Sequence, residues 1–248
     1  MKLLLKNKIL ITGTTNGIGK ALAEYYIKLG YKVIGIDRNL NTDLAENSNY
    51  HQIITDITNT KKVDEIINKF ISKNDMPQYF ILNAGVNIYD NTEFFNVNEF
   101  KRCFDINFYG SFNFISSLEK YKLKKIKILV ISSTSKIIPN PATLGYFSSK
   151  YLLHKLTTYL SSEIDYKVAI LGPIKTDISR NLQKPSGLAL VIYKLLIVDT
   201  NKLPLKIDKF LKSNKKRLYF TKKSLFIYNI IKLILIFFPS LYKGGKSK

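Results

Sequence analysis

Residues 8–19, KILITGTTNGIG, join a short apolar run to a glycine-rich turn and the start of a helical pattern. Small residues at such a junction let the backbone turn tightly and approach a pyrophosphate, whose charge is met by the amides and dipole of the helix N-terminus. This stretch therefore predicts a dinucleotide-binding turn. Its candidate contact residues are Gly13, Thr15, Asn16, Gly17, Ile18 and Gly19.

The alternation of a short apolar run with a helical pattern recurs along the chain. Further runs are YKVIGI at 31–36, HQIIT at 51–55, QYFILN at 78–83, KIKILVISS at 125–133 and YKVAIL at 166–171, with helices expected near 17–29, 61–72, 98–121 and 146–162. Short strands that alternate with amphipathic helices are typical of βαβ units. The pattern predicts one α/β domain, a doubly wound parallel sheet (Rossmann fold) in three layers, with RLYF at 217–220 as a possible further edge strand.

Composition limits the class of protein. The 248 residues are 46% apolar, enough for a packed core, which excludes a disordered chain. The formal charge of +21 raises nucleic acid or an anionic membrane as partners. Residues 201–248 carry +12 of this charge and contain no recognised nucleic-acid motif, so we expect no nucleic-acid partner. A single cysteine, Cys103, and a start without a secretory signal predict a cytoplasmic protein.

The second predicted strand is followed by Asp37 and Arg38. A carboxylate at this position can accept hydrogen bonds from the adenosine ribose hydroxyls and would repel a 2′-phosphate, which favours NAD over NADP. Arg38 leaves NADP possible, because its guanidinium can pair with that phosphate, although Asn16 supplies no second cation.

Five ordered motifs carry a resemblance to a known family. TGTTNGIG is followed by LNAG at 82–85, Asn107 in DINFYG, Ser133 in VISST and YFSSK at 146–150. Together they resemble the short-chain dehydrogenase/reductase family, in its compact branch, over about residues 7–180. The resemblance implies an NAD(P)-dependent oxidoreductase, in which a hydride moves between nicotinamide and the carbon of a carbonyl or secondary alcohol.

The resemblance implies a role for each residue of the catalytic group. Tyr146 is the general acid or base, Ser133 stabilises the substrate oxygen, and Lys150 holds the nicotinamide ribose. Asn107 helps seat a water that links Lys150 to solvent. Lys150 lies four residues after Tyr146, one helical turn away, so we expect its ammonium to lower the pKa of the phenol. Taken singly, these residues are ordinary surface or strand-end residues, and only their joint occurrence indicates catalysis.

Further nucleotide contacts come from the same resemblance. Asp56 would receive the adenine amino group with Ile57 beside the ring, and Asn83, Ala84 and Gly85 would line the adenosine side. Thr176 would meet the nicotinamide carboxamide, with backbone contacts from Ile174. Leu171 stands where the family commonly has proline. The two histidines, His51 and His154, lie apart from clustered carboxylates, so we expect no metal site.

Two segments stay open to alternatives. Residues 177–205, on the substrate side, include the apolar run SGLALVIYKLLIV, which suits either a cover over a hydrophobic substrate or a helix packed on the core. We separate a catalytic domain, 1–221, from a basic, apolar tail, 222–248. The apolar run in this tail is too short to cross a bilayer. It either packs on the core or on a partner subunit, or it makes a peripheral membrane contact through 222–243.

The leading interpretation is therefore an enzyme that acts on CH–OH and C=O groups, and the family resemblance implies a homo-oligomer, a dimer or a tetramer. The alternative is a protein of the same fold that binds a nucleotide and serves as a regulatory or membrane-surface protein without significant turnover.

Overall fold

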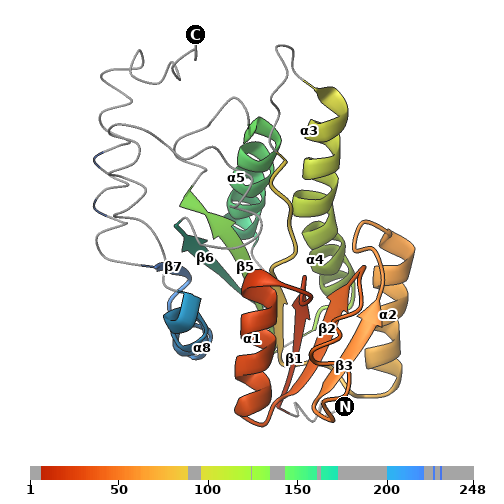
Figure 1. Ribbon diagram of the computed structural model, residues 1–248. Coiled ribbons are helices and arrows are strands. Elements are labelled where there is room, and N and C mark those ends of the chain that lie inside the picture. Colours follow the sequence, from red (N-terminus) through yellow and green to blue (C-terminus); the bar gives the residue numbers. More distant parts are fainter. Residues whose placement is uncertain are drawn as a thin grey trace.

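A computed structural model of the protein contains one parallel sheet with helices on both of its faces (Figure 1). It describes residues 7–88, 96–123, 125–134, 143–160, 163–172 and 200–220, together with Phe226 and Ile230. The strands are β1 (Lys8–Thr12), β2 (Lys32–Asp37), β3 (Tyr50–Ile54), β4 (Tyr79–Leu82), β5 (Lys127–Ser133), β6 (Asp165–Leu171) and β7 (Arg217–Tyr219).

The strands lie in the order β3-β2-β1-β4-β5-β6-β7, and all the pairs are parallel. The order reverses between β1 and β4, because the chain first builds outward to β3 and then returns to the other side of β1. In open parallel sheets, ligands bind at the carboxyl ends of the strands beside such a reversal. The predicted doubly wound sheet is confirmed, including the edge strand at RLYF.

Helices cover both faces of the sheet, which makes three layers. One face packs on α1 (Gly17–Lys28) and α8 (Leu203–Lys212), and the other on α2 (Thr60–Ser72), α4 (Gly110–Lys120) and α5 (Leu144–Tyr159). Neighbouring residues of β1 serve the two cores in turn, since Ile9 and Ile11 face α1 while Leu10 faces α2 and α4. A strand buried on both faces reads as a continuous apolar run, and that is why these strands stand out in the sequence.

The predicted helix over 98–121 is wrong in one detail. The chain forms α3 (Val97–Phe104), then a five-residue π-helix, η1 (Asp105–Tyr109), and then α4. The amide of Gly110 accordingly donates to the carbonyl of Asp105, five residues back. Such π-turns inside α-helices occur often at functional sites, and this one contains Asn107.

Two lysines fasten α8 to the sheet. Lys127 Nζ on β5 donates to the Leu211 carbonyl at 3.0 Å. Lys167 Nζ on β6 donates to the carbonyls of Ser213 and Lys215 at 2.7 and 2.8 Å. These ammonium groups meet carbonyls at the C-terminal end of the helix, where the helix dipole favours positive charge.

We did not predict α8 from the sequence. Its buried apolar residues are Leu203, Pro204, Ile207, Phe210 and Leu211, which recur at helical spacing. The helix begins inside the 177–205 segment and continues beyond it. A short 3₁₀ turn, η4 (Thr200–Lys202), leads into it. Among the helices whose residues are described, none has the length and apolar character needed to cross a bilayer.

Candidate active site

The glycine-rich turn after β1 is packed too closely for side chains at two of its positions. A Cβ atom on Gly19 would lie 1.9 Å from the carbonyl oxygen of Gly13, and one on Gly13 would lie 2.9 Å from the Cα of Ala84. Gly13 also has φ +76°, a left-handed conformation that favours glycine. The N-terminus of α1 is thereby drawn against the end of β1 and the residues that follow β4.

Hydrogen bonds of Asn83 and Thr12 connect this turn to the residues that follow β4. Asn83 Nδ2 donates to the Thr12 carbonyl at 3.0 Å and to the Gly13 carbonyl at 3.3 Å. The Thr12 hydroxyl oxygen accepts from the amides of Asn83 and Ala84, both at 3.0 Å. Thr12 was not among the sequence candidates, and its position as the last residue of a buried strand is the only signal for it.

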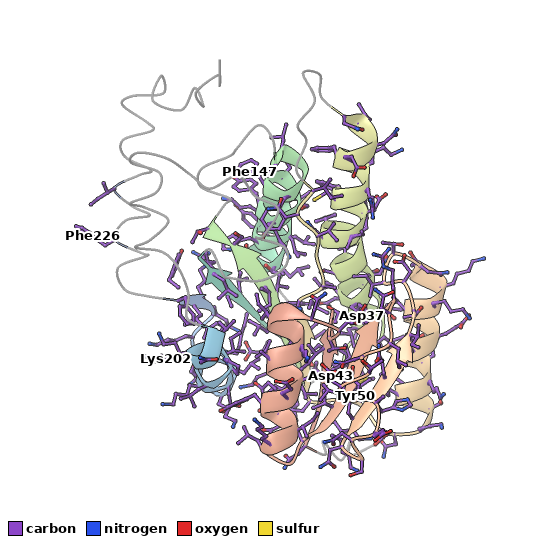
Figure 2. All side chains as sticks on the ribbon, in the orientation of Figure 1. Asp37, Asp43, Tyr50, Phe147, Lys202 and Phe226 are labelled. Carbon is purple, nitrogen blue, oxygen red and sulfur yellow. The ribbon has the colours of Figure 1, made fainter. Side chains whose placement is uncertain are left out.

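Asp37 lies at the end of β2, beside the turn, and is labelled in Figure 2. Its carboxylate accepts from the Thr15 amide at 3.0 Å and from the Asn39 amide at 3.2 Å. Thr15 in turn donates its hydroxyl to the Asn39 carbonyl. The carboxylate therefore joins the turn after β1 to the turn after β2, at the edge where the adenosine ribose is expected.

The remaining adenosine-side candidates lie around this edge. Arg38 Nη1 is 4.0 Å from Asp56 Oδ2, and both side chains are about half exposed. Asp56 Oδ1 accepts from the amide and hydroxyl of Thr58, each at 2.9 Å. Ile57 is buried and packs on α4, since a Cβ atom on Gly110 would lie 2.4 Å from its Cδ1.

The four catalytic candidates come from three elements that converge at the carboxyl end of β5. Ser133 is the last residue of β5, Tyr146 and Lys150 lie in the first turns of α5, and Asn107 lies in η1. Phe147, labelled in Figure 2, marks that end of α5. The Ser133 side chain hydrogen-bonds the Tyr146 phenol. Lys150 is buried, and its Nζ donates to the Ile131 carbonyl at 3.1 Å.

Our expectation that Lys150 lowers the pKa of Tyr146 is not met in the free protein. Burial raises the pKa of the Tyr146 phenol, and only the hydrogen bond from Ser133 opposes this effect. Burial also lowers the pKa of Lys150 to about 8. Desolvation disfavours the charged form of both groups and is the largest influence on each pKa, and Lys150 is not among the groups that shift the pKa of Tyr146. Near neutral pH the phenol keeps its proton and the ammonium is mostly charged.

Asn107 is fully buried and binds the chain that follows β4. Its Oδ1 accepts from the Val86 amide at 2.7 Å, and its Nδ2 donates to the Val86 carbonyl at 2.9 Å. The same Nδ2 lies 3.1 Å from Ser149 Oγ and 3.2 Å from Cys103 Sγ. The amide thus fixes the segment after LNAG against α3 and α5.

Cys103 is buried. Its Sγ donates to the Val86 carbonyl at 3.3 Å, and burial raises the pKa of the thiol. In the part of the chain that the structure describes, no three His, Cys, Asp or Glu side chains gather as a metal site would require.

Because Gly85 has no side chain, Asn107 and Lys150 can both approach its backbone closely. A Cβ atom on Gly85 would lie 2.8 Å from Asn107 Oδ1 and 3.1 Å from Lys150 Nζ. Both atoms therefore lie close to the same point of the backbone, three residues after the end of β4. The predicted contacts Ile174 and Thr176, most of the 177–205 segment and most of the tail from 222 onward lie outside the described residues.

A sequence model of the short chain dehydrogenases matches residues 7–187. The chain belongs to the short-chain dehydrogenase family. Among curated relatives, an uncharacterised oxidoreductase of Schizosaccharomyces pombe is 29% identical over 164 residues, which cover 63% of this chain and 55% of that protein. The 3-ketodihydrosphingosine reductase of Bacteroides thetaiotaomicron is 27% identical over 66% of this chain and 62% of its own length.

Another short-chain dehydrogenase relative is named for its cofactor. The NADPH-dependent pterin aldehyde reductase of Arabidopsis thaliana is 26% identical over 68% of this chain and 76% of that protein. The chain thus spans less than two thirds of the first two relatives. Among solved structures, a short chain dehydrogenase/reductase of Burkholderia phymatum in complex with NAD has a TM-score of 0.74 at 16% identity, with 98% of each chain covered. This similarity confirms the fold.

Proposed function

We propose that this short-chain dehydrogenase is an NAD(P)-dependent oxidoreductase that interconverts a carbonyl compound and the corresponding alcohol. One observation carries the proposal: the hydroxyls of Ser133 and Tyr146 are hydrogen-bonded at the carboxyl end of the sheet, with Lys150 one turn along the same helix. In the glycine-rich turn, side chains at Gly13 and Gly19 would collide with neighbouring atoms. At Gly85 the absence of a side chain lets Lys150 Nζ lie close to the backbone. These features fit a dinucleotide laid across the ends of β1 and β4.

Tyr146, Ser133 and Lys150 each have a separate role in the proposed reaction. Bound nicotinamide supplies the hydride chemistry. In the reducing direction Tyr146 donates its proton to the substrate oxygen, and its raised pKa keeps that proton available at neutral pH. Ser133 hydrogen-bonds the same oxygen and stabilises its developing charge. Lys150 binds the nicotinamide ribose and places a positive charge beside the phenolate that forms.

A substrate screen tests this proposal. Ketones, secondary alcohols and fatty aldehydes, with 3-ketodihydrosphingosine included because of the Bacteroides relative, are each supplied with NADH or NADPH, or with the oxidised forms. We expect a change in nicotinamide absorbance with at least one apolar carbonyl compound. Binding of the nucleotide without turnover of any compound would favour the alternative, a regulatory or membrane-surface protein of the same fold. Ser133, Tyr146 and Lys150 are all present, which favours the enzyme.

We propose NAD rather than NADP as the preferred cofactor, and Asp37→Ala tests this. Removing the carboxylate removes its repulsion of a 2′-phosphate and its hydrogen bond to the Thr15 amide. The ratio of the Kd for NADPH to the Kd for NADH is expected to fall by at least about tenfold, or about 1.4 kcal/mol. Nicotinamide fluorescence measures both constants.

Asp43→Ala is the matched control. Asp43 is an exposed acid that pairs with Lys20 and is also labelled in Figure 2. This variant should keep the wild-type ratio. An equal ratio in wild type and Asp37→Ala would contradict the assignment of Asp37.

Assembly and location stay proposals. A homo-oligomer is supported by exposed aromatic and aliphatic side chains on η1 and α5, namely Tyr109, Tyr151, Leu152 and Tyr159. Light scattering that gives the mass of a 28.5 kDa monomer would contradict it. We also propose a cytoplasmic protein, with peripheral membrane contact through 222–243 as an option that vesicle sedimentation tests.

A further inference from the structure

The side-chain amide of Asn107 has its orientation fixed by its neighbours. The Val86 amide has only a hydrogen to offer, so the Asn107 atom 2.7 Å from it must be the oxygen. The opposite atom is therefore the nitrogen, which has two hydrogens. One points to the Val86 carbonyl at 2.9 Å, and the other is available to Ser149 Oγ at 3.1 Å, with Cys103 Sγ at 3.2 Å beside it.

This orientation also fixes the hydroxyl of Ser149, which is fully buried. Because Ser149 Oγ accepts from Asn107, its single hydrogen is free to donate, and it points to the Tyr146 carbonyl at 2.9 Å. Donors and acceptors match at each step from Val86 through Asn107 and Ser149 to Tyr146. A buried network in which each member is satisfied holds its groups in one arrangement.

The outcome is an amide oxygen that lies near the ammonium of Lys150. Asn107 Oδ1 and Lys150 Nζ both lie close to the point where a side chain on Gly85 would begin. The negative end of the amide dipole at this place stabilises a positive charge on Lys150. If the amide turned over, its N–H groups would face the ammonium and disfavour it.

We propose that Ser149 is a positioning residue, which holds the Asn107 amide with its oxygen toward Lys150 and ties that amide to the turn of α5 that contains Tyr146. This rests on the proposed function, in which Lys150 acts as a cation beside Tyr146. Ser149 itself need not touch substrate or nucleotide. Nothing in the motif singles it out, since YFSSK has two adjacent serines and only Ser149 makes both contacts among the described hydrogen bonds.

The test is the titration of Lys150 in Ser149→Ala. Lysine labelled with ¹⁵N reports the protonation of Nζ by NMR, and the signal that titrates near pH 8 is assigned by its loss in Lys150→Met. Without Ser149 Oγ the Asn107 amide loses one of its acceptors and holds its oxygen less firmly. The midpoint is expected to fall by roughly half a unit to one unit, the equivalent of one hydrogen bond. The Cys103 thiol also acts on Lys150, so its ionisation is followed in the same samples.

Thr157→Ala is the matched control. Thr157 is a buried hydroxyl of the same helix that donates to the carbonyls of Leu153 and His154. This variant should leave the midpoint of Lys150 unchanged. An unchanged midpoint in Ser149→Ala, or an equal fall in both variants, would overturn the proposal.

A second variant and the use of the free protein allow the titration of Lys150 to decide the proposal. If Ser149→Ala fails to fold by circular dichroism, Ser149→Cys carries the same comparison, with a smaller fall because a thiol is a weaker acceptor. The titration uses the free protein and needs no turnover. Failure of wild type to turn over any compound would therefore refute the proposed function without moving the midpoint of Lys150.

Discussion

Tyr146→Phe is expected to lower kcat by about 10²- to 10⁴-fold, the usual contribution of a positioned general acid. The substitution removes the phenolic hydroxyl, and with it both the proton for the substrate oxygen and the hydrogen bond with Ser133. The ring stays, so packing in the first turns of α5 is preserved. The Kd for NADH should change little. Initial rates on the best compound from the screen, together with fluorescence titration of NADH, measure the two effects.

Tyr151→Phe is the control for this experiment. Tyr151 lies on the same helix, five residues further along, and is 42% exposed. Loss of its hydroxyl should leave both kcat and the Kd for NADH at wild-type values. Turnover in Tyr146→Phe at the wild-type rate would remove Tyr146 from the mechanism. Loss of NADH binding in that variant would instead give the ring a structural role.

Gly19→Ala is expected to abolish NADH binding at concentrations that saturate the wild type. The new methyl group would lie 1.9 Å from the Gly13 carbonyl oxygen and 2.7 Å from Asn83 Nδ2. The first neighbour is backbone, so the start of α1 must move away from β1. This shift breaks the hydrogen bonds of Asn83 to the turn, and the free energy of unfolding should fall by about 3 kcal/mol. Urea denaturation and NADH fluorescence measure both losses.

Gly30→Ala is the control, because it tests a left-handed backbone conformation without the steric crowding found at Gly19. Gly30 ends the turn after α1 with φ +78°, and a Cβ atom there would meet nothing within 4 Å. Alanine in this left-handed conformation should cost about 1–2 kcal/mol and leave the Kd for NADH unchanged. Equal NADH affinity in Gly19→Ala and wild type would show that the close approach of Gly13 and Gly19 is not required for binding.

The strands were the most predictable part of the fold. All seven strands in the described part of the chain are found in the predicted runs. Central parallel strands such as β1 and β4 are buried on both faces, so their residues are mostly apolar. The edge strand β7 was recognised as well, although it has only three residues. The helix α8 was missed because its apolar residues continue the apolar 177–205 segment, which we had assigned to the substrate side.

The positions of several candidate site residues at the ends of elements were predictable from the sequence. Gly13, Asp37 and Asn107 lie where the motifs placed them, since each motif directly follows or opens an element that the sequence marks. What the sequence did not contain was the balance of forces around Tyr146 and Lys150. Burial governs both pKa values, and burial depends on neighbours that come from distant parts of the chain.

The five-residue η1 segment has a consequence for comparing this chain with others. An α-helix turns by about 100° per residue, so one residue more or less within a regular helix redirects all side chains that follow it. Cys103, Asn107 and Ser111 are all buried across the junction, a spacing of four that a regular α-helix would let drift around its axis over longer stretches. The wider π-turn takes up one extra residue without this rotation, so deleting a single amino acid at 105–109 would restore a regular helix and leave the buried face of α4 on the sheet. Alignments should therefore allow a one-residue gap within 105–109 rather than inside α3 or α4.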